Sequence, residues 1–172
     1  DIEPSRGLGD VYKRQADYSP AVATGGSTIA FAWRANGQVW VSLLDGEGQV
    51  LGEGPTTVSP TGVTAMPAVG MSASGLFVVT WVAGSSVFFQ RFNAQGQSQS
   101  GVVEVSQDPA WAAQAPSISM RADGTFVVAY LSGDDIFGHN YDANGDPVSE
   151  VYGVNMAENT TDGPFAGEPR QG

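Results

Sequence analysis

The side chains of Asp142, Asn144 and Asp146 have a spacing at which a loop could bind calcium. They occupy alternate positions in Asp142-Ala-Asn-Gly-Asp146, as the first oxygen ligands of a calcium loop do. Two features oppose this hypothesis: Pro147 stands where such a loop needs glycine, and Glu150 comes too early to serve as the bidentate ligand. We therefore expect a structural turn and no cofactor, with a calcium site as the alternative.

His139 is the only histidine in the chain. A catalytic triad or a metal centre built on it would need serine and aspartate, or further histidines, close by. Its counterparts in two similar segments are Ser42 and Gln90, so this position accepts ordinary polar residues. We interpret His139 as a surface residue of a strand and predict no catalytic residue in the chain.

Trp111 is the one candidate ligand-binding residue. It lies in the connector Asp-Pro-Ala-Trp-Ala-Ala-Gln at 108–114, where an exposed indole could stack on a sugar. The alternative is that Trp111 packs within the connector.

Asp134 and Asp135 could form a pair of catalytic carboxylates, but adjacent residues on a strand point to opposite faces.

Charge and composition exclude several classes of function. The chain carries 18 acidic and 7 basic residues, for a net charge of −11. Such a surface repels phosphate groups, so we expect neither nucleic acid nor an anionic membrane as a partner. Cysteine is absent, which excludes disulfides and thiolate chemistry from this chain. No apolar run is long enough to span a membrane.

Four landmarks recur with one period and predict three repeats. Three of the landmarks, an aromatic residue, an aspartate or asparagine, and a glycine, recur after 48 and then after 49 residues. The fourth, a proline, recurs after 47 and then after 49 residues. The landmarks are Trp33, Trp81 and Tyr130; Asp45, Asn93 and Asp142; Gly48, Gly96 and Gly145; and Pro20, Pro67 and Pro116. We place the repeats at about 16–60, 61–108 and 109–157, with 158–172 as the start of a further, truncated repeat.

Each repeat reads as four strands joined by tight turns, which predicts an all-β fold. The first strand of each repeat is expected to begin at the proline, where no N–H is needed. The expected strands are 20–23, 28–33, 38–44 and 50–58 in the first repeat, 67–70, 76–81, 86–92 and 98–105 in the second, and 116–119, 125–130, 135–141 and 147–154 in the third.

The second strand of each repeat is apolar on both faces. One face, the bulky face, carries Ile29, Phe31 and Trp33 in the first repeat and equally large residues in the others. The opposite face, the small face, carries Ala30 and Ala32 or residues of similar size. Sheets with two apolar faces must be covered on both sides, so we predict that the three sheets stack with a bulky face against a small one.

The third repeat resembles a known family. Its phrase Pro116-Ser-Ile-Ser-Met-Arg-Ala-Asp-Gly-Thr-Phe-Val-Val-Ala-Tyr130, followed by Asp135-Ile-Phe-Gly-His-Asn-Tyr-Asp-Ala-Asn-Gly-Asp-Pro-Val148, is similar to tandem β-propeller-type repeats of large bacterial secreted and cell-surface proteins. The resemblance implies three four-stranded antiparallel blades of a partial β-propeller and an extracellular or cell-surface location. It assigns no reaction.

A different resemblance concerns the start of the chain. Residues 6–15, Arg-Gly-Leu-Gly-Asp-Val-Tyr-Lys-Arg-Gln, resemble a peptide produced when adapter sequence is translated in metagenomic gene predictions. They also contain the only lysine of the chain. We therefore expect residues 1–15 to be a non-native leader without fixed structure.

Three functions are compatible with these observations. The first is a non-catalytic repeat module of an exported bacterial protein, serving adhesion or the binding of a protein or glycan ligand. The second is a fragment of a secreted propeller enzyme acting on glycans, with its catalytic residues on blades missing here. The third is a structural spacer. In each case the exposed blade faces are expected to meet further blades of the parent chain or a second copy.

Overall fold

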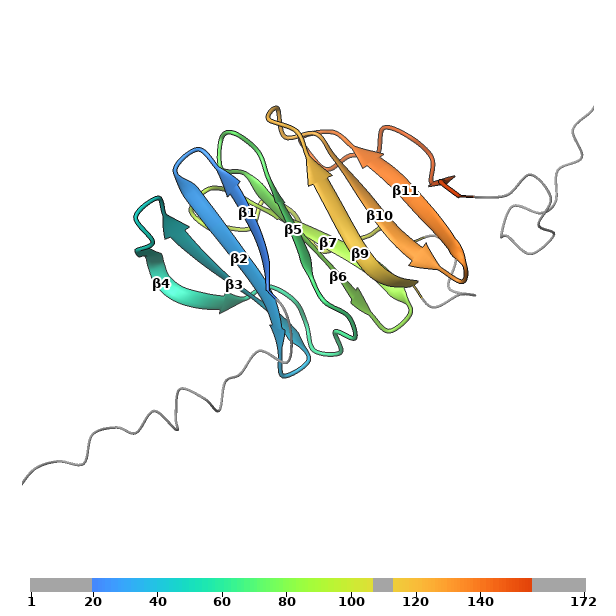
Figure 1. The fold of residues 1–172 in the computed structure, drawn as a ribbon, viewed down its shortest axis with the longest axis horizontal. Coiled ribbons are helices and arrows are strands. Elements are labelled where there is room, and N and C mark those ends of the chain that lie inside the picture. Colours follow the sequence, from blue (N-terminus) through green and yellow to red (C-terminus); the bar gives the residue numbers. More distant parts are fainter. Residues whose placement is uncertain (1–19, 107–112, 156–172) are drawn as a thin grey trace, which may run out of the picture.

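The computed structural model describes residues 20–106 and 113–155, which form three four-stranded antiparallel sheets (Figure 1). The predicted all-β class and the three four-stranded repeats are confirmed. In each sheet the strands follow one another in chain order, as expected where tight turns join successive strands. Within the described residues, no helix is long and apolar enough to cross a membrane.

The twelve strands fall into three sheets, named here sheet 1 to sheet 3. Sheet 1 contains β1 (Ala21–Gly25), β2 (Thr28–Ala35), β3 (Gln38–Asp45) and β4 (Val50–Thr57). Sheet 2 contains β5 (Ala68–Met71), β6 (Phe77–Ala83), β7 (Ser86–Phe92) and β8 (Val103–Glu104). Sheet 3 contains β9 (Ala113–Met120), β10 (Phe126–Ser132), β11 (Asp135–Tyr141) and β12 (Tyr152–Gly153).

The turn between β2 and β3 shows how local sequence sets the pairing of strands. Asn36 and Gly37 both have positive φ, 54° and 68°, and they join the paired residues Ala35 and Gln38. A two-residue turn with two left-handed residues matches the twist of a hairpin, and Asn-Gly is the pair that adopts it most readily. The register of β2 against β3 follows directly from this turn.

The expected start of the first strand of sheet 3 is wrong. The first strand of sheet 3 begins at Ala113, three residues before Pro116. Its ladder shifts register opposite Ala129 and Leu131, and Ala115 has a φ of 47°. This irregularity, on an edge strand, lets the chain continue through a proline that cannot donate a hydrogen bond.

The fourth strands of sheets 2 and 3 are shorter than expected. β8 and β12 have two residues each. The chain before them pairs with its neighbour through an isolated bridge in each sheet, Phe92 with Ser98 and Tyr141 with Pro147, and through single backbone hydrogen bonds, from Gln99 N–H to the Arg91 carbonyl and from Val148 N–H to the Asn140 carbonyl. Only β4 has the expected length.

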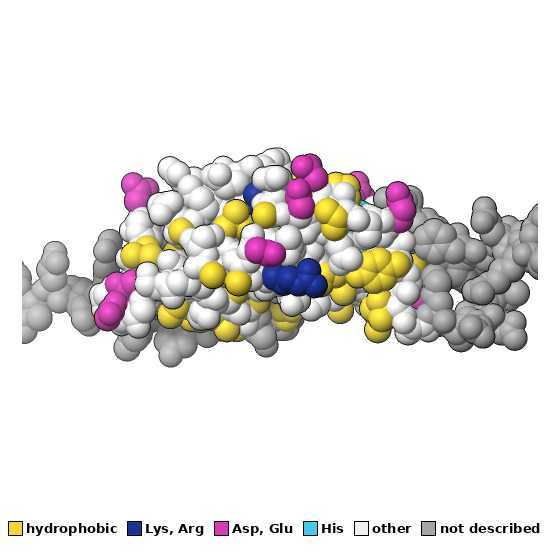
Figure 2. All heavy atoms as spheres, turned by 90° about the horizontal axis from the view of Figure 1, so that it is seen from above, with side chains coloured by type: hydrophobic (Ala, Val, Ile, Leu, Met, Phe, Trp, Pro, Cys, Tyr) yellow, Lys and Arg dark blue, Asp and Glu magenta, His cyan; other side chains and the backbone are white. Residues whose placement is uncertain are grey.

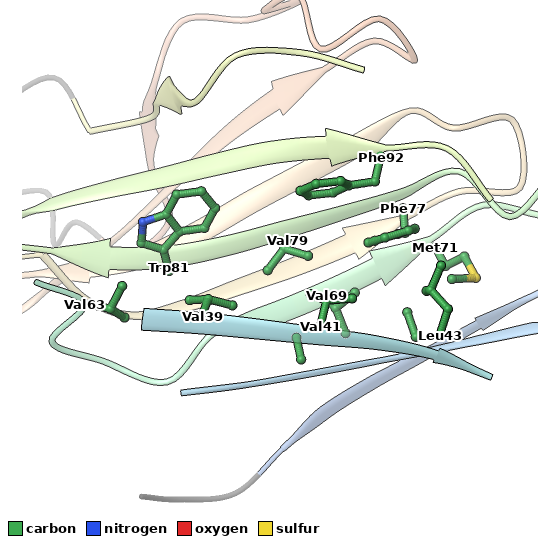
Figure 3. Packing of buried hydrophobic residues seen from close by; sticks show 12 residues of the cluster. Val39, Val41, Leu43, Val63, Val69, Met71, Phe77, Val79, Trp81 and Phe92 are labelled. Carbon is green, nitrogen blue, oxygen red and sulfur yellow. The ribbon is translucent and has the colours of Figure 1, made fainter. Parts of the chain in front are cut away.

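The first hydrophobic core lies between sheets 1 and 2 (Figure 3). Sheet 1 contributes its small face, and sheet 2 contributes its bulky face. The buried members include Ala30, Ala32, Val39, Val41 and Leu43 from sheet 1, and Val69, Met71, Phe77, Val79, Trp81 and Phe92 from sheet 2. The aromatic rings of sheet 2 therefore fill the space left by the alanines of β2.

The second core repeats this arrangement between sheets 2 and 3. Its members include Val78, Val82, Val87 and Phe89 from the small face of sheet 2, and Phe126, Val128, Tyr130, Phe137 and Tyr141 from the bulky face of sheet 3. The ring of Phe89 meets Phe126 and Tyr141 edge-on, with centroid distances of 5.3 and 4.9 Å. The predicted pairing of bulky against small faces is thus confirmed at both interfaces.

The small face is not small along its whole width. Its third strand supplies large side chains, Val39 and Leu43 in sheet 1 and Phe89 and Arg91 in sheet 2. Inter-sheet contacts concentrate on the first strands, β1 against β5 and β5 against β9, so the sheets approach one another most closely along that side.

A capping contact recurs where the chain leaves each sheet. A side-chain oxygen after the fourth strand accepts a hydrogen bond from an N–H near the start of the third strand. The pairs are Val39 N–H to Ser59 Oγ at 2.7 Å, Val87 N–H to Ser106 Oγ at 3.0 Å, and Ile136 N–H to Asn155 Oδ1. This Val-Ser or Val-Asn landmark keeps the repeat period and was missed in the sequence.

We expect Ser59→Ala to lower the free energy of unfolding by about 1–3 kcal/mol, because the buried Val39 N–H loses its acceptor. Ser106→Ala removes the same contact in sheet 2, where it is only partly buried, and should cost less. Equilibrium urea unfolding of both variants measures the difference. Equal losses, or none, would show that burial does not govern this contact.

Candidate functional site

The turn at Asp142–Asp146, the candidate metal site, is closed by its own hydrogen bonds. Oδ1 of Asp142 accepts the N–H of Asn144 at 2.8 Å and the N–H of Asp146 at 2.9 Å. The Asn144 amide also donates to Oδ2 of Asp142, at 3.4 Å. The carboxylate therefore stabilises the turn, as short polar side chains do where the backbone reverses.

The equivalent turns of the other sheets have the same geometry. Asp45 Oδ1 accepts two N–H groups, at 3.0 and 2.7 Å. Asn93 Oδ1 also accepts two, at 3.0 and 2.9 Å, although its amide is neutral. A negative charge is thus not needed for this turn. No group of three or more His, Cys, Asp or Glu side chains that could hold a metal ion occurs within 20–106 and 113–155.

Arg91 introduces a positive charge beside the candidate metal site. It extends from β7, and its guanidinium donates hydrogen bonds to the carbonyls of Ala143 and Asn144 in the neighbouring sheet. Arg91 is 8% exposed, so water screens its charge only weakly. A cation bound at this turn would be repelled by the guanidinium, which favours the structural interpretation of Asp142, Asn144 and Asp146.

Hydrogen bonding lowers the pKa of Asp142 below its ordinary value, with the N–H of Asp146 as the main cause and that of Asn144 in support. The ionised carboxylate therefore stabilises the folded chain above the pKa of an unfolded aspartate. This contribution is lost as the pH falls through the lowered pKa.

We expect Asp142→Asn to preserve the turn, as Asn93 does, while removing this pH-dependent contribution. Urea midpoints measured from neutral to acidic pH should converge for the two proteins as wild type loses its advantage. Asp134→Asn, in an exposed turn, controls for the loss of one charge. Calcium should shift neither midpoint, and a rise confined to wild type would restore the calcium hypothesis.

His139 is buried, with 6% exposure, so its interpretation as a surface residue is wrong. It lies on the bulky face of sheet 3, which sheet 2 covers, and this could not be read from its own strand. Its Nε2 is 2.8 Å from the Ser149 carbonyl, and its Nδ1 is 2.8 Å from the Tyr141 hydroxyl. A carbonyl only accepts, so Nε2 carries the hydrogen and Nδ1 accepts from Tyr141.

Both nitrogens of His139 therefore serve structural hydrogen bonds. Burial raises the pKa of Tyr141, which keeps its hydroxyl protonated and able to donate.

Of the two adjacent carboxylates, Asp134 lies in the turn between β10 and β11, and Asp135 is the first residue of β11. The candidate Trp111, the leader 1–15 and the segment 158–172 lie outside the described residues.

At the two ends of the stack, one face of sheet 1 and one face of sheet 3 are not covered by any other sheet of the described residues (Figure 1). The sheet-1 outer face is its bulky face, and the sheet-3 outer face is its small face. The first includes Val22, Thr24, Ile29, Phe31, Trp33, Trp40, Ser42 and Leu44. The second includes Ser117, Ser119, Val127, Ala129, Leu131, Ile136, Gly138, Asn140 and Tyr152. Exposed blade faces were expected from the sequence, but which face of which sheet is exposed could not be read from it, because the repeat pattern is the same in covered and uncovered sheets.

Exposure values show that these faces lack a neighbour within the described chain. Val22 is 56% exposed, while Val69, its counterpart in sheet 2, is 8% exposed. On the sheet-3 outer face, Ile136 and Tyr152 are each 40% exposed. Carboxylates are dispersed over the side of the molecule shown in Figure 2 and do not gather into one patch.

A groove crosses one rim of the stack between sheets 1 and 2. It encloses about 570 Å³ and is formed by the β1–β2 hairpin and β4 of sheet 1 and by turn residues of sheet 2. Its lining includes Gly26, Ser27, Gly52, Ser74 and Gln95. Hydroxyl, amide and backbone groups of this kind can hydrogen-bond an uncharged polar ligand without supplying a reactive group.

No protein-family model matches the chain, and no curated protein matches it either.

Proposed function

We propose that the chain is a non-catalytic repeat module of an exported bacterial protein, whose three sheets are consecutive blades of a β-propeller and serve adhesion or ligand binding. The observation that carries this proposal is the repeated stacking of a small face on a bulky face, with the first strands closest together. Blades arranged around an axis pack in this way. The resemblance to repeats of secreted and cell-surface proteins supports the location.

The polar groups support a binding role over a catalytic one. A nucleophile or a general base must have a free reactive atom within reach of its substrate. His139 has both nitrogens engaged, and Asp142 is occupied by the N–H groups of its own turn. Arg91 is directed to backbone carbonyls of the next sheet. These groups stabilise the blades and their packing.

The groove at the rim is the best candidate for a ligand site. It joins the β1–β2 turn to turns of sheet 2, so one ligand could contact two blades at once. Small side chains leave room for a ring or an extended chain, and Ser27 and Ser74 offer hydroxyl groups. A neutral glycan or an extended peptide fits this chemistry, while an anionic ligand would oppose the net charge of −11.

A glycan array tests the proposal directly. We expect the chain to bind a restricted set of neutral glycans, and Ser27→Trp to abolish binding because the indole fills the groove. Thr56→Trp, an equally exposed position on β4 outside the lining residues, is the matched control and should bind normally. Turnover of a bound glycan would contradict a non-catalytic role, and an array without any binding would leave the structural spacer as the better hypothesis.

A further inference from the structure

We propose that two copies of this chain associate head to tail, with the sheet-3 outer face of each copy packed on the sheet-1 outer face of the other. This inference concerns a surface away from the groove and does not depend on the ligand proposed for it. Both internal interfaces join the small face of one sheet to the bulky face of the next. The sheet-1 outer face is a bulky face and the sheet-3 outer face is a small face, and each lacks a partner of the other kind among the described sheets.

The first strands of neighbouring sheets approach one another most closely, and the corresponding residues of two copies could make the same contact. A Cβ placed on Gly70 would lie 3.2 Å from Cβ of Met120 and 3.3 Å from a side-chain carbon of Ile118, so sheets 2 and 3 nearly touch there. In the repeat alignment Ser119 corresponds to Gly70, and Thr24 and Val22 correspond to Met120 and Ile118. At the contact between two copies, Ser119 is larger than its counterpart Gly70, but Thr24 and Val22 are smaller than Met120 and Ile118. The total side-chain volume at this contact is therefore preserved.

The outer hairpin turns give a second, independent match. A Cβ on Gly96 would lie 3.2 Å from Leu43, and one on Gly145 would lie 2.7 Å from Arg91. Each turn is therefore covered by the same repeat position of the preceding sheet. The counterpart turn of sheet 1, at Gly48, has no heavy atom within 4 Å of that point. Asn140 of a second copy holds the matching repeat position and can cover it.

The composition of the outer faces provides the driving force. The sheet-1 outer face presents Phe31, Trp33 and Trp40, each half-buried, around the exposed Val22. The sheet-3 outer face presents Ile136 and Tyr152, and a hollow of about 260 Å³ lies beside Val127. Large apolar side chains exposed together on a sheet face mark association surfaces in soluble proteins.

Two copies are expected to close on themselves. A head-to-tail contact forms an open fibre unless rotation brings the last free face back to the first. Two copies would bring six sheets together, and propellers close with about four to eight blades. Both contacts between a sheet-3 outer face and a sheet-1 outer face then form within one dimer, and no outer face is left free.

Sedimentation velocity across a concentration series tests the proposal with two exposed positions that would meet in the joint. We expect wild type to dimerise, and Val22→Asp and Ser119→Arg each to weaken dimerisation at least about thirtyfold, because each leaves an unpaired charge in a desolvated contact. An equimolar mixture of the two variants should dimerise again, since one joint is wild type and the other pairs aspartate with arginine. Circular dichroism and melting temperature confirm that both variants fold.

Val102→Arg, exposed and outside both outer faces, is the control and should dimerise normally. A wild-type chain that is monomeric at every concentration would overturn the proposal. Dimerisation sensitive to Val22→Asp but indifferent to Ser119→Arg would also overturn it, because the sheet-1 outer faces would then be pairing with each other. Open-ended growth of wild type would overturn the closed dimer.

Discussion

Trp81→Ala is expected to lower the free energy of unfolding by about 3–5 kcal/mol, since a large aromatic side chain is removed from a closely packed core. Trp81 is completely buried between sheets 1 and 2, where it lies near Val39 and Val63 (Figure 3). Its ring also stacks on Phe88, with 6.4 Å between centroids. The indole N–H has no hydrogen-bond partner among the described residues, so the loss is one of packing.

Trp33 supplies a matched control because it occupies the same repeat position in sheet 1. It lies on the sheet-1 outer face and is only half-buried, so Trp33→Ala should cost about 1–2 kcal/mol in the monomer. Both variants can be compared by equilibrium urea unfolding followed by far-ultraviolet circular dichroism, in the Val22→Asp background, in which we expect the chain to be monomeric. Equal losses would mean that the face of sheet 1 is as well covered as that of sheet 2.

Gly25→Ala is the second change with a large expected effect, about 3 kcal/mol of destabilisation, because overpacking here forces a backbone to move. A Cβ on Gly25 would lie 1.9 Å from the Ser72 carbonyl oxygen and 2.7 Å from Cγ of Met71. The oxygen belongs to the main chain and cannot rotate away. Because Gly25 does not have positive φ, its backbone suits alanine, and the clash alone causes the effect.

Gly46→Ala is the control for Gly25→Ala. Gly46 likewise lacks a positive φ, and a Cβ there would meet no atom within 4 Å. This change should be neutral or stabilise the fold by about 0.4–1 kcal/mol, since it restricts only the unfolded chain. Hydrogen exchange should show faster opening of β1 and β5 in Gly25→Ala alone. Equal stability of the two variants would mean that sheets 1 and 2 are not in contact along these strands.

Much of the local structure was predictable because it depends on neighbours in the sequence. The third strands have the expected bounds to within one residue, and the second strands begin within one residue of the expected position but end two residues later. The reversals between them follow from turn-forming pairs such as Asn36-Gly37. The structural interpretation of the Asp142–Asp146 turn is supported by the hydrogen bonds of that turn. Each of these features spans only a few residues, so local chemistry is sufficient to specify it.

Other features depend on what lies across an interface. His139 was misread as exposed because nothing in its own strand reveals that sheet 2 covers it. Arg91 was overlooked because its partners, the carbonyls of Ala143 and Asn144, belong to another repeat. The start of β9 was misplaced because the register shift opposite Ala129 compensates for Pro116.

The sequence by itself determined that this protein consists of three four-stranded repeats with two apolar faces each. Periodicity and residue size specify these, because both are properties of every repeat separately. Only the tertiary structure decided which faces are covered, since coverage depends on the neighbour that a sheet has. The same pattern therefore buries Trp81 and leaves Trp33 half-exposed. That difference leaves the bulky face of sheet 1 as a surface of the described chain, which we propose is used for association.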